Sequence, residues 1–292
     1  MKRLITACFL FFFGLSLSAQ TPVFRTFKDT RIINSHSVET LAKRKLDIRI
    51  GHRFGDLLGD NGGWPTFYGL ENATDILIGA EYGFTNDLSV GAYRTKGAGP
   101  LKQLINLSGK YRLIQQAEGG SPISLVVLGV GSVSTMSKDE NSAGINQFPK
   151  FAHRMAYSGQ LLVARKFSDN FSVQLTPAYT HRNLVSDGDV NGIFSIGAAT
   201  RIQLTKVWGL IAEAVIPLNG PQSPFETSPD NLPEYFPTLS LGFEIDTGGH
   251  IFQINFTNAS GIIATDFIPN NTSDWLSGQF RFGFTISRTF NL

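Results

Sequence analysis

Eleven charged residues occupy the polar positions of segments in which apolar and polar residues alternate, and they are the main candidates for chemistry. Six of them are basic and five are acidic. An interior lined by one sign of charge would favour a selective pore, whereas a balanced set favours opposite charges that pair across a narrow interior. The residues predicted to face inward are Asp47, Arg49, Arg53, Asp75, Glu81, Lys110, Arg154, Arg201, Glu213, Glu244 and Arg281.

Two of the acidic residues, Asp75 and Glu81, lie on one segment of the chain. Paired carboxylates can act as a general acid and a general base. However, Arg49 and Arg53 lie on the segment predicted to be its neighbour. Carboxylates beside guanidinium groups form charge-assisted hydrogen bonds, so we expect structural ion pairs here and not catalysis.

The histidines give little support for a metal site or a catalytic site. His153 and His181 are predicted to lie near the outer rim of one hairpin, and neutral imidazole binds transition metals, but no third ligand follows at a fixed spacing. Ser158, which a lipase-like barrel enzyme could use, is predicted to point away from His153. The sequence also lacks the G-x-x-x-x-G-K-[ST], G-x-S-x-G and H-E-x-x-H patterns. We predict no catalytic residue, no cofactor, no metal ligand and no enzyme activity.

Alternation with a period of two residues runs from residue 46 to the C-terminus. Successive side chains of a strand point to opposite faces, so this pattern predicts strands. Three further segments are less regular: 88–95 is short, 101–113 also fits an amphipathic helix, and 123–133 is apolar on both faces. Leu77 is an apolar exception on a polar parity. The regular segments are 46–54, 75–84, 160–167, 171–180, 194–203, 208–216, 239–246, 252–257 and 279–290.

Short and long connections alternate between these segments. Asn, Asp and Gly fill the short ones and are residues that tolerate tight turns. Tight turns at one rim and longer loops at the other are typical of outer-membrane barrels. We predict an all-β fold, a transmembrane antiparallel up-and-down β-barrel of about twelve strands, closed because no backbone group can stay unpaired in lipid. A soluble β-sandwich or lipocalin-like barrel is the alternative, since alternation alone fits both.

Composition and aromatic placement agree with a membrane barrel. Charged residues make up 16% of the chain, against about 25% in soluble domains, and no basic patch supports nucleic-acid binding. Aromatic residues at both membrane interfaces are expected of a barrel, and outer-membrane lipid is the predicted partner. Those beside the short turns are Phe84, Phe167, Phe171 and Trp208, and those toward the long loops are Phe54, Tyr157, Tyr179, Phe194 and Phe280.

Residues 1–19 are typical of a cleaved signal peptide, with Lys2 and Arg3 before an apolar run and small residues before Gln20. The run is shorter than a membrane-spanning helix requires. Removal of this segment lowers Lys+Arg from 25 to 23, equal to the 23 Asp+Glu. It also removes Cys8, the one cysteine, so the mature chain has no disulfide.

The remaining chain divides into a polar periplasmic segment, residues 20–45, and the barrel, residues 46–292. The segment could be a flexible lead-in, fold into the lumen as a plug, or bind a periplasmic partner. The proline-rich loop 217–237 could be a surface excursion, an external cap or a recognition loop. The oligomeric state cannot be predicted from these features.

Two stretches resemble a known family. Residues 26–56 contain Thr-Phe-Lys-Asp-Thr-Arg-Ile-Ile-Asn and Leu-Asp-Ile-Arg-Ile-Gly-His-Arg-Phe-Gly-Asp, and residues 78–91 read Ile-Gly-Ala-Glu-Tyr-Gly-Phe-Thr-Asn-Asp-Leu-Ser-Val-Gly. They resemble an uncharacterised family of outer-membrane β-barrels from Bacteroidetes-type bacteria. The resemblance spans nearly the whole mature chain. It implies the fold and an outer-membrane location, but no site residues.

Three functions fit this reading, in decreasing order of support. The first is a narrow channel or uptake component for small solutes, because the inward parity is polar. The second is a scaffold or partner-docking barrel that uses residues 20–45 or the proline-rich loop. The third, a lipid-modifying barrel enzyme, depends only on the rim histidines.

Overall fold

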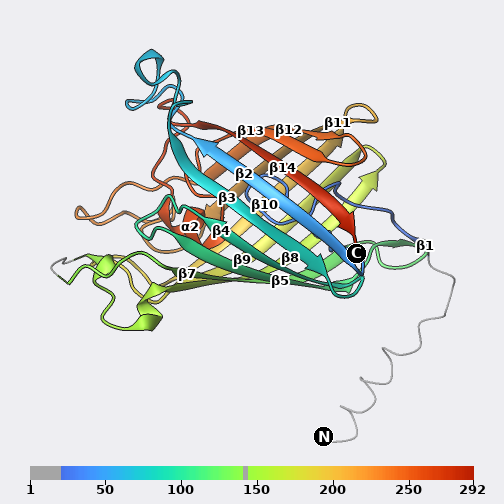
Figure 1. Ribbon diagram of the computed structural model, residues 1–292, viewed down its shortest axis with the longest axis horizontal. Helices are drawn as coiled ribbons and strands as arrows, with labels where there is room; N and C mark the ends of the chain where they lie inside the picture. Colours follow the sequence, from blue (N-terminus) through green and yellow to red (C-terminus); the bar gives the residue numbers. More distant parts are fainter. Residues whose placement is uncertain (1–20, 141–143) are drawn as a thin grey trace, which may run out of the picture.

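The computed structural model describes residues 21–140 and 144–292, and within them twelve antiparallel strands close into one barrel (Figure 1). This confirms the predicted fold class and strand number. Each strand pairs with its sequence neighbour, and β14 pairs with β2 to close the ring. The strands are β2 (Lys45–Phe54), β3 (Ala73–Gly83), β4 (Leu88–Thr95), β5 (Leu104–Ile114), β7 (Ser124–Ser134), β8 (Met155–Ser168), β9 (Phe171–Arg182), β10 (Gly192–Gln203), β11 (Trp208–Pro217), β12 (Thr238–Asp246), β13 (Ile251–Thr257) and β14 (Arg281–Asn291).

The elements outside the barrel wall are short. At the short-turn end, β1 (Thr21–Pro22) pairs with β6 (Ala117–Glu118) as a two-stranded ribbon. The predicted signal peptide, residues 1–19, lies outside the described residues. None of the helices within 21–140 and 144–292 is long and apolar enough to cross a membrane. These helices are η1 (Trp64–Thr66), η2 (Ile145–Gln147), η3 (Phe151–Arg154) and α2 (Ala264–Asn270).

The alternation of apolar and polar residues produces an outer and an inner barrel surface that differ chemically. On β5, which had also fitted a helix, Ile105 and Leu107 are 44% and 58% exposed on the outside. Asn106, Ser108 and Lys110, between and beyond them, are buried on the inside. The same division recurs on most of the other strands, with β7 as the main exception, so the barrel exposes apolar side chains and buries most of its polar ones. A soluble barrel would do the opposite, and this distribution therefore favours a lipid-facing outer wall.

The connections separate into two rims (Figure 1). Short turns such as 84–87 between β3 and β4, and 247–250 between β12 and β13, lie at one rim. In the second of these, Gly248 has φ of 81°, a left-handed angle that glycine adopts at little cost. Long loops leave the other rim. The alternation of short and long connections predicted from the sequence thus corresponds to the two ends of the barrel.

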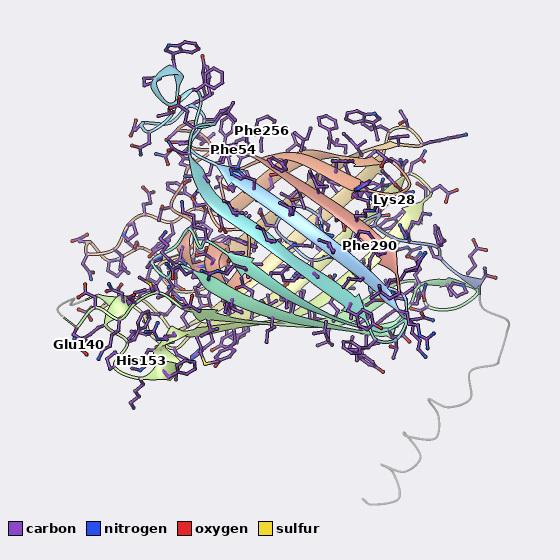
Figure 2. The ribbon with its side chains drawn as sticks, viewed as in Figure 1. Lys28, Phe54, Glu140, His153, Phe256 and Phe290 are labelled. Carbon is purple, nitrogen blue, oxygen red and sulfur yellow. The ribbon has the colours of Figure 1, made fainter. Side chains whose placement is uncertain are left out.

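Aromatic side chains are exposed on the outer wall near both rims. At the short-turn end Phe84 and Phe167 are 53% and 58% exposed, and at the long-loop end Phe194 is 58% exposed. Figure 2 shows Phe54 and Phe256 at the long-loop end of the wall and Phe290 at the opposite end. Two such girdles are expected where a barrel crosses the two membrane interfaces.

A lipid-facing wall predicts that the cost of an added charge depends on depth. Leu107 and Leu113 share the outward parity of β5, but Leu113 lies near the short turn. We expect Leu107→Arg to lower the free energy of unfolding by about 2–4 kcal/mol and Leu113→Arg by about 0–1 kcal/mol, because the interface is wetter than the hydrocarbon. Denaturant titrations of the barrel folded into vesicles measure both. Equal costs at the two positions would contradict the lipid-facing assignment.

Candidate functional site: a lumen filled by two inserts

Residues 26–41, the N-terminal insert, fold into the barrel as a small hairpin. The Ser37 N–H donates to the Thr30 carbonyl at 3.0 Å, and the Ile32 N–H donates to the Ser35 carbonyl at 2.9 Å. These bonds close a tight tip at residues 32–35. Most side chains of the insert are less than 9% exposed. The segment before the first barrel strand is therefore a luminal plug, one of the three possibilities that the sequence left open.

A buried ion pair attaches the insert to the wall. Asp29 receives both terminal nitrogens of Arg49 on β2, Nη1 to Oδ2 at 2.8 Å and Nη2 to Oδ1. Arg49 also pairs with Asp47 on the same strand, at 3.1 Å, and Gln253 donates to Asp29 at 3.3 Å. All of these side chains are nearly fully buried. A bidentate guanidinium–carboxylate pair fixes position as well as charge, so it sets the depth of the insert in the lumen.

The hairpin tip is held by a second set of contacts. The Asn34 and Ser35 N–H groups donate to the two carboxylate oxygens of Glu213 on β11, at 2.9 and 3.0 Å. Arg53 on β2 donates to the Asn34 side-chain oxygen at 2.6 Å, and Asn34 itself donates to Ser240 on β12 at 3.0 Å. Asn34 thus forms hydrogen bonds with residues of three strands, β2, β11 and β12.

Lys110 on β5 holds the base of the hairpin. Its Nζ donates to the Thr30 carbonyl at 2.6 Å and to the Glu39 carbonyl at 3.0 Å. The partner carboxylate of Lys110 is Glu81 on β3, at 4.0 Å, which also accepts from Ser89 at 2.5 Å. The Lys110 ammonium therefore binds both arms of the insert, and its counter-ion, Glu81, lies on the wall.

His36 is buried in this insert under conditions that disfavour its charge. Burial lowers the pKa of His36 well below its ordinary value, and the nearby Arg31, Lys110 and Arg49 lower it further. Gln174 on β9 donates to the His36 carbonyl at 2.8 Å and accepts from the Val38 N–H at 2.9 Å. The imidazole is therefore neutral in the docked insert.

The insert also has an apolar side, which explains two irregularities in the sequence. Phe27, Ile32, Ile33 and Val38 join one buried cluster with inward-facing wall residues. The wall residues in it include Leu77, the exception on β3, and three side chains of β7, the strand that is apolar on both faces. Apolar side chains on the luminal side of a strand are stabilised when protein covers them, as the insert does here. The full cluster adds Tyr93, Val126, Leu128, Val130, Leu162, Ala164, Ala199, Ile211, Ile262 and Ile263.

A second insert enters from the opposite end. Residues 258–271 of the long loop between β13 and β14, which include α2, fold back into the barrel mouth (Figure 1). The Ile262 N–H donates to Asp75 on β3 at 3.0 Å, and Thr265 contacts Ser132 on β7 at 2.6 Å. Arg31 of the N-terminal insert donates to the Ile262 carbonyl at 3.0 Å. The two inserts, which we call the N-terminal insert and the loop insert, therefore meet in the lumen.

Asp266 anchors the loop insert to a neighbouring loop. Its two carboxylate oxygens accept from the Ala98 and Gly99 N–H groups, at 2.8 and 2.9 Å. Burial raises the pKa of Asp266 above its ordinary value, and these N–H donors oppose that shift. A side chain at position 99 would clash with Asp266, since a Cβ there would lie 2.4 Å from its carboxylate. Any other residue at position 99 would therefore have to displace the Asp266 and Asn270 side chains from this contact.

The other charged residues singled out in the sequence lie in three settings. Arg201 and Glu244 form a pair within the wall at 2.7 Å. Arg281, at the start of β14, donates to the Asn258 carbonyl and to Ser273 of the last long loop, at 3.0 and 2.9 Å. Arg154 belongs to the helix η3 and not to a strand: it donates to the Met136 carbonyl at 2.6 Å and stacks on Phe148.

The prediction that Arg49 and Arg53 on β2 form ion pairs with Asp75 and Glu81 on β3 is wrong. Arg53 lies opposite Asp75 in register, but it donates to Asn34, and Asp75 accepts backbone N–H groups from Gly97 and Ile262. Glu81 likewise pairs with Lys110 and not with an arginine. Protein fills the lumen beside Arg53 and Asp75, so these two residues bind groups of the inserts and loops, whereas Glu81 finds its cation on β5. The signal available in the sequence was the apolar inner face of β7.

The rim histidines do not come together with further ligands. His153 in η3 accepts a hydrogen bond from the Lys150 N–H at 3.3 Å, while His181 stacks with Tyr179 on β9, with ring centroids 6.3 Å apart. Within the described residues, no group of three His, Cys, Asp or Glu side chains could hold a metal ion.

Free space in the barrel is divided unequally. A cavity of about 550 Å³ opens at the short-turn end, between the N-terminal insert and strands β2, β13 and β14. Beside the hairpin tip, near Asn34 and His36, the free volume falls to about 10 Å³, roughly the space of one water molecule. A pocket of about 60 Å³ lies at the other end, beside Arg154 and Asp266. The insert thus borders two of these spaces, the large cavity at its base and the smallest of the three at its tip.

The wall, the girdles and the filled lumen define a membrane β-barrel with a plug. The chain belongs to the family described as Membrane bound beta barrel domain (DUF5777), whose model matches residues 27–290. The match includes the N-terminal insert, so the plug is part of the family's domain and not an appendage to it. No curated protein matches the chain.

Several solved barrels are similar in structure. The KdgM porin is 10% identical over 84% of this chain and 99% of its own, with a TM-score of 0.49. The COG4313 outer membrane channel from Pseudomonas putida F1 is 13% identical over 87% and 98%, with a TM-score of 0.49. The NanC porin is 8% identical over 85% and 100%, with a TM-score of 0.47.

The ion pair at Asp29 makes a testable contribution to docking of the insert. We expect Asp29→Asn to weaken docking by about 3 kcal/mol, the lower end for a broken buried pair, because Asp47 still neutralises Arg49. Amide hydrogen exchange of residues 29–38 should accelerate while the barrel strands stay protected. Asp189→Asn is the control, since it breaks a buried pair with Arg182 in the outer loops. Equal effects of both variants on residues 29–38 would contradict the assignment.

Docking of the insert should also depend on pH through His36. The folded pKa is lowered, so protons bind the undocked histidine first, and stability falls as pH drops below the ordinary pKa of about 6.5. The slope is about 1.4 kcal/mol per pH unit for one proton. Exchange rates of residues 29–38 measured between pH 7 and pH 5 report it, and His36→Gln should flatten the profile. An unchanged profile in that variant would exclude His36 as the cause.

Proposed function

We propose that this protein is an outer-membrane conduit for small polar solutes, closed in the state described and opened when the N-terminal insert leaves the lumen and the loop insert, which it contacts through Arg31, moves from the mouth. The observation that carries the proposal is the chemistry of the interface between insert and wall. Asp29, Asn34 and the backbone of the insert contact the wall through hydrogen bonds and an ion pair. Water can replace such partners on an open polar wall, which it cannot do for a purely apolar core.

The inner wall supports passage once the insert is displaced. Residues such as Glu213, Arg53, Lys110 and Gln174 would line the vacated lumen together with serine and threonine side chains. The acidic and basic groups are interspersed, so the lining favours small polar or zwitterionic solutes over ions of one sign. The large cavity at the short-turn end forms a vestibule to this path.

The direction of the barrel and the pattern of residues 1–19 support an outer-membrane location. Residues 1–19 have the pattern of an export signal, and the short turns and both ends of the described chain lie at one rim (Figure 1). In outer-membrane barrels that rim faces the periplasm. The N-terminal insert therefore enters from the periplasmic side, where a periplasmic partner that binds residues 20–45 could draw it out.

A docking barrel is the second candidate, favoured by the completeness of the packing. The two inserts contact each other, and apolar side chains of both join the same buried cluster. A barrel that never opens would present its loops and the ribbon of β1 and β6 to partners. Conductance distinguishes this candidate from the conduit.

Single-channel recording in planar bilayers tests the conduit. We expect the wild-type barrel to be closed most of the time, and Asp29→Asn to raise the open fraction at least about tenfold, because 1.4 kcal/mol of weaker docking suffices for a tenfold change. Glu244→Gln is the matched control: it removes a buried carboxylate that pairs with Arg201 in the wall.

The outcomes separate the two candidates. Openings that increase with Asp29→Asn but not with Glu244→Gln support a plug that gates the lumen. A barrel that stays silent with Asp29→Asn, while hydrogen exchange shows the insert released, would leave the docking barrel as the function.

A further inference from the structure

The loop between β2 and β3, residues 55–72, carries exposed aromatic rings at its tip. Trp64 is 72% exposed, Phe67 50% and Tyr68 41%. Phe67 and Tyr68 lie edge-on to Trp64, with ring centroids 5.9 and 6.4 Å away. Figure 1 shows this loop leaving the long-loop rim and turning outward, away from the barrel axis and beyond the wall. The rings therefore lie to the side of the barrel and not over its mouth.

This tip, the aromatic tip of residues 64–68, is held in a defined shape. Phe67 and Tyr68 have φ of 46° and 56°, angles that cost energy for bulky residues. The Tyr68 N–H donates to the Gly63 carbonyl at 2.7 Å, and the Gly55 N–H donates to the Gly69 carbonyl at 2.9 Å. These bonds close the neck of the loop and support the strained turn. The rings are thus presented by a turn whose backbone is fixed by hydrogen bonds.

The loop is continuous with the apolar belt of the outer wall. The Leu57 N–H donates to the Phe280 carbonyl at 2.8 Å, and the Leu58 N–H donates to the Gly278 carbonyl at 3.2 Å. Phe280 stacks on Trp275 at 4.5 Å, and Leu276 beside it is 97% exposed. Figure 2 shows Phe54 and Phe256 on the wall at the foot of this loop. An apolar strip therefore runs from the lipid-facing wall onto the loop.

The charges of the loop point to a neutral apolar partner. Its ionisable side chains are Asp56, Asp60, Glu71 and Tyr68, and residues 55–72 contain no lysine or arginine. Attraction to anionic headgroups, which lysine and arginine provide, is therefore absent. Trp and Tyr rings, in contrast, favour the boundary between headgroups and acyl chains.

We propose that the aromatic tip inserts into the outer-leaflet interface and anchors this side of the barrel to the lipid surface. Trp64 would lie at the depth of the headgroup boundary, beyond the circumference of the wall. The partner is the lipid bilayer itself, and binding arises from burial of the rings. Insertion should therefore require neither anionic lipid nor low salt.

Fluorescence quenching of Trp64 tests the proposal. The chain has three tryptophans, so Trp208→Phe with Trp275→Phe leaves Trp64 as the only emitter. The variant is folded into phosphatidylcholine vesicles with bromine on the acyl chains. We expect at least a twofold loss of Trp64 emission relative to unbrominated vesicles, and protection from the aqueous quencher acrylamide. A single-tryptophan variant that keeps Trp208, which is 43% exposed on the wall, gives the response of a lipid-facing residue.

A matched control supplies the response of a residue in water. Glu140→Trp in a chain without the three native tryptophans places the ring on another long loop, at a side chain 78% exposed. Figure 2 shows Glu140 at the far end of the loops, away from the wall. If the triple background folds poorly, the difference between wild-type and Trp64→Phe spectra isolates Trp64 in an otherwise native chain.

The results decide between lipid and other partners. Trp64 that is quenched like Trp208, with or without added phosphatidylglycerol or salt, supports insertion. Trp64 that behaves like the ring at position 140, quenched by acrylamide and unaffected by bromine, overturns it. Protection from acrylamide that appears only with added soluble glycans would assign the rings to sugar stacking and would also overturn it.

Discussion

Buried polar groups need partners, and this constraint accounts for both surfaces of the barrel. In lipid, a strand must have its N–H and C=O groups bonded to neighbouring strands, so the sheet closes between β14 and β2. Inside, the side chains that alternation sends to the lumen face the same requirement. Arg49, Lys110 and Glu213 satisfy it by binding the N-terminal insert. The plug is therefore a consequence of having so many polar groups in a narrow interior.

The same contacts explain how a packed lumen can be compatible with opening. The insert is held at its base by Lys110 and by the pair of Asp29 and Arg49, and at its tip by Glu213 and Arg53. Each partner on the wall stays in place when the insert leaves, and water can solvate it. The apolar side of the insert opposes release, since Phe27, Ile32 and Val38 would lose burial against β7 and its neighbours. The balance between these contributions sets how often the lumen opens.

The two ends of the barrel are built for different surroundings. The short-turn rim admits the N-terminal insert and encloses the large cavity, whereas the long-loop rim is capped by the loop insert, which is held through Asp75 and Asp266. The loop of residues 55–72 leaves that second rim sideways and presents aromatic rings at its tip. A chain with few charged residues can therefore place its polar groups inside and its aromatic groups against lipid, and each placement follows from what the group contacts.

Local alternation determined the strands, their number and the parity that faces inward, because the period of a strand depends on sequence positions alone. Turn residues such as those around Gly248 determined which connections are short. Only the tertiary structure decided what fills the lumen. The hydrogen bond from Arg49 to Asp29 joins residues 20 positions apart, and the one from Arg31 to Ile262 joins residues 231 positions apart. No local pattern encodes such partners, so the expected arginine pairs with Asp75 and Glu81 could not be corrected from the sequence. The apolar inner face of β7 and the inward Leu77 of β3 were the local traces of the plug, since inward positions beside water are usually polar.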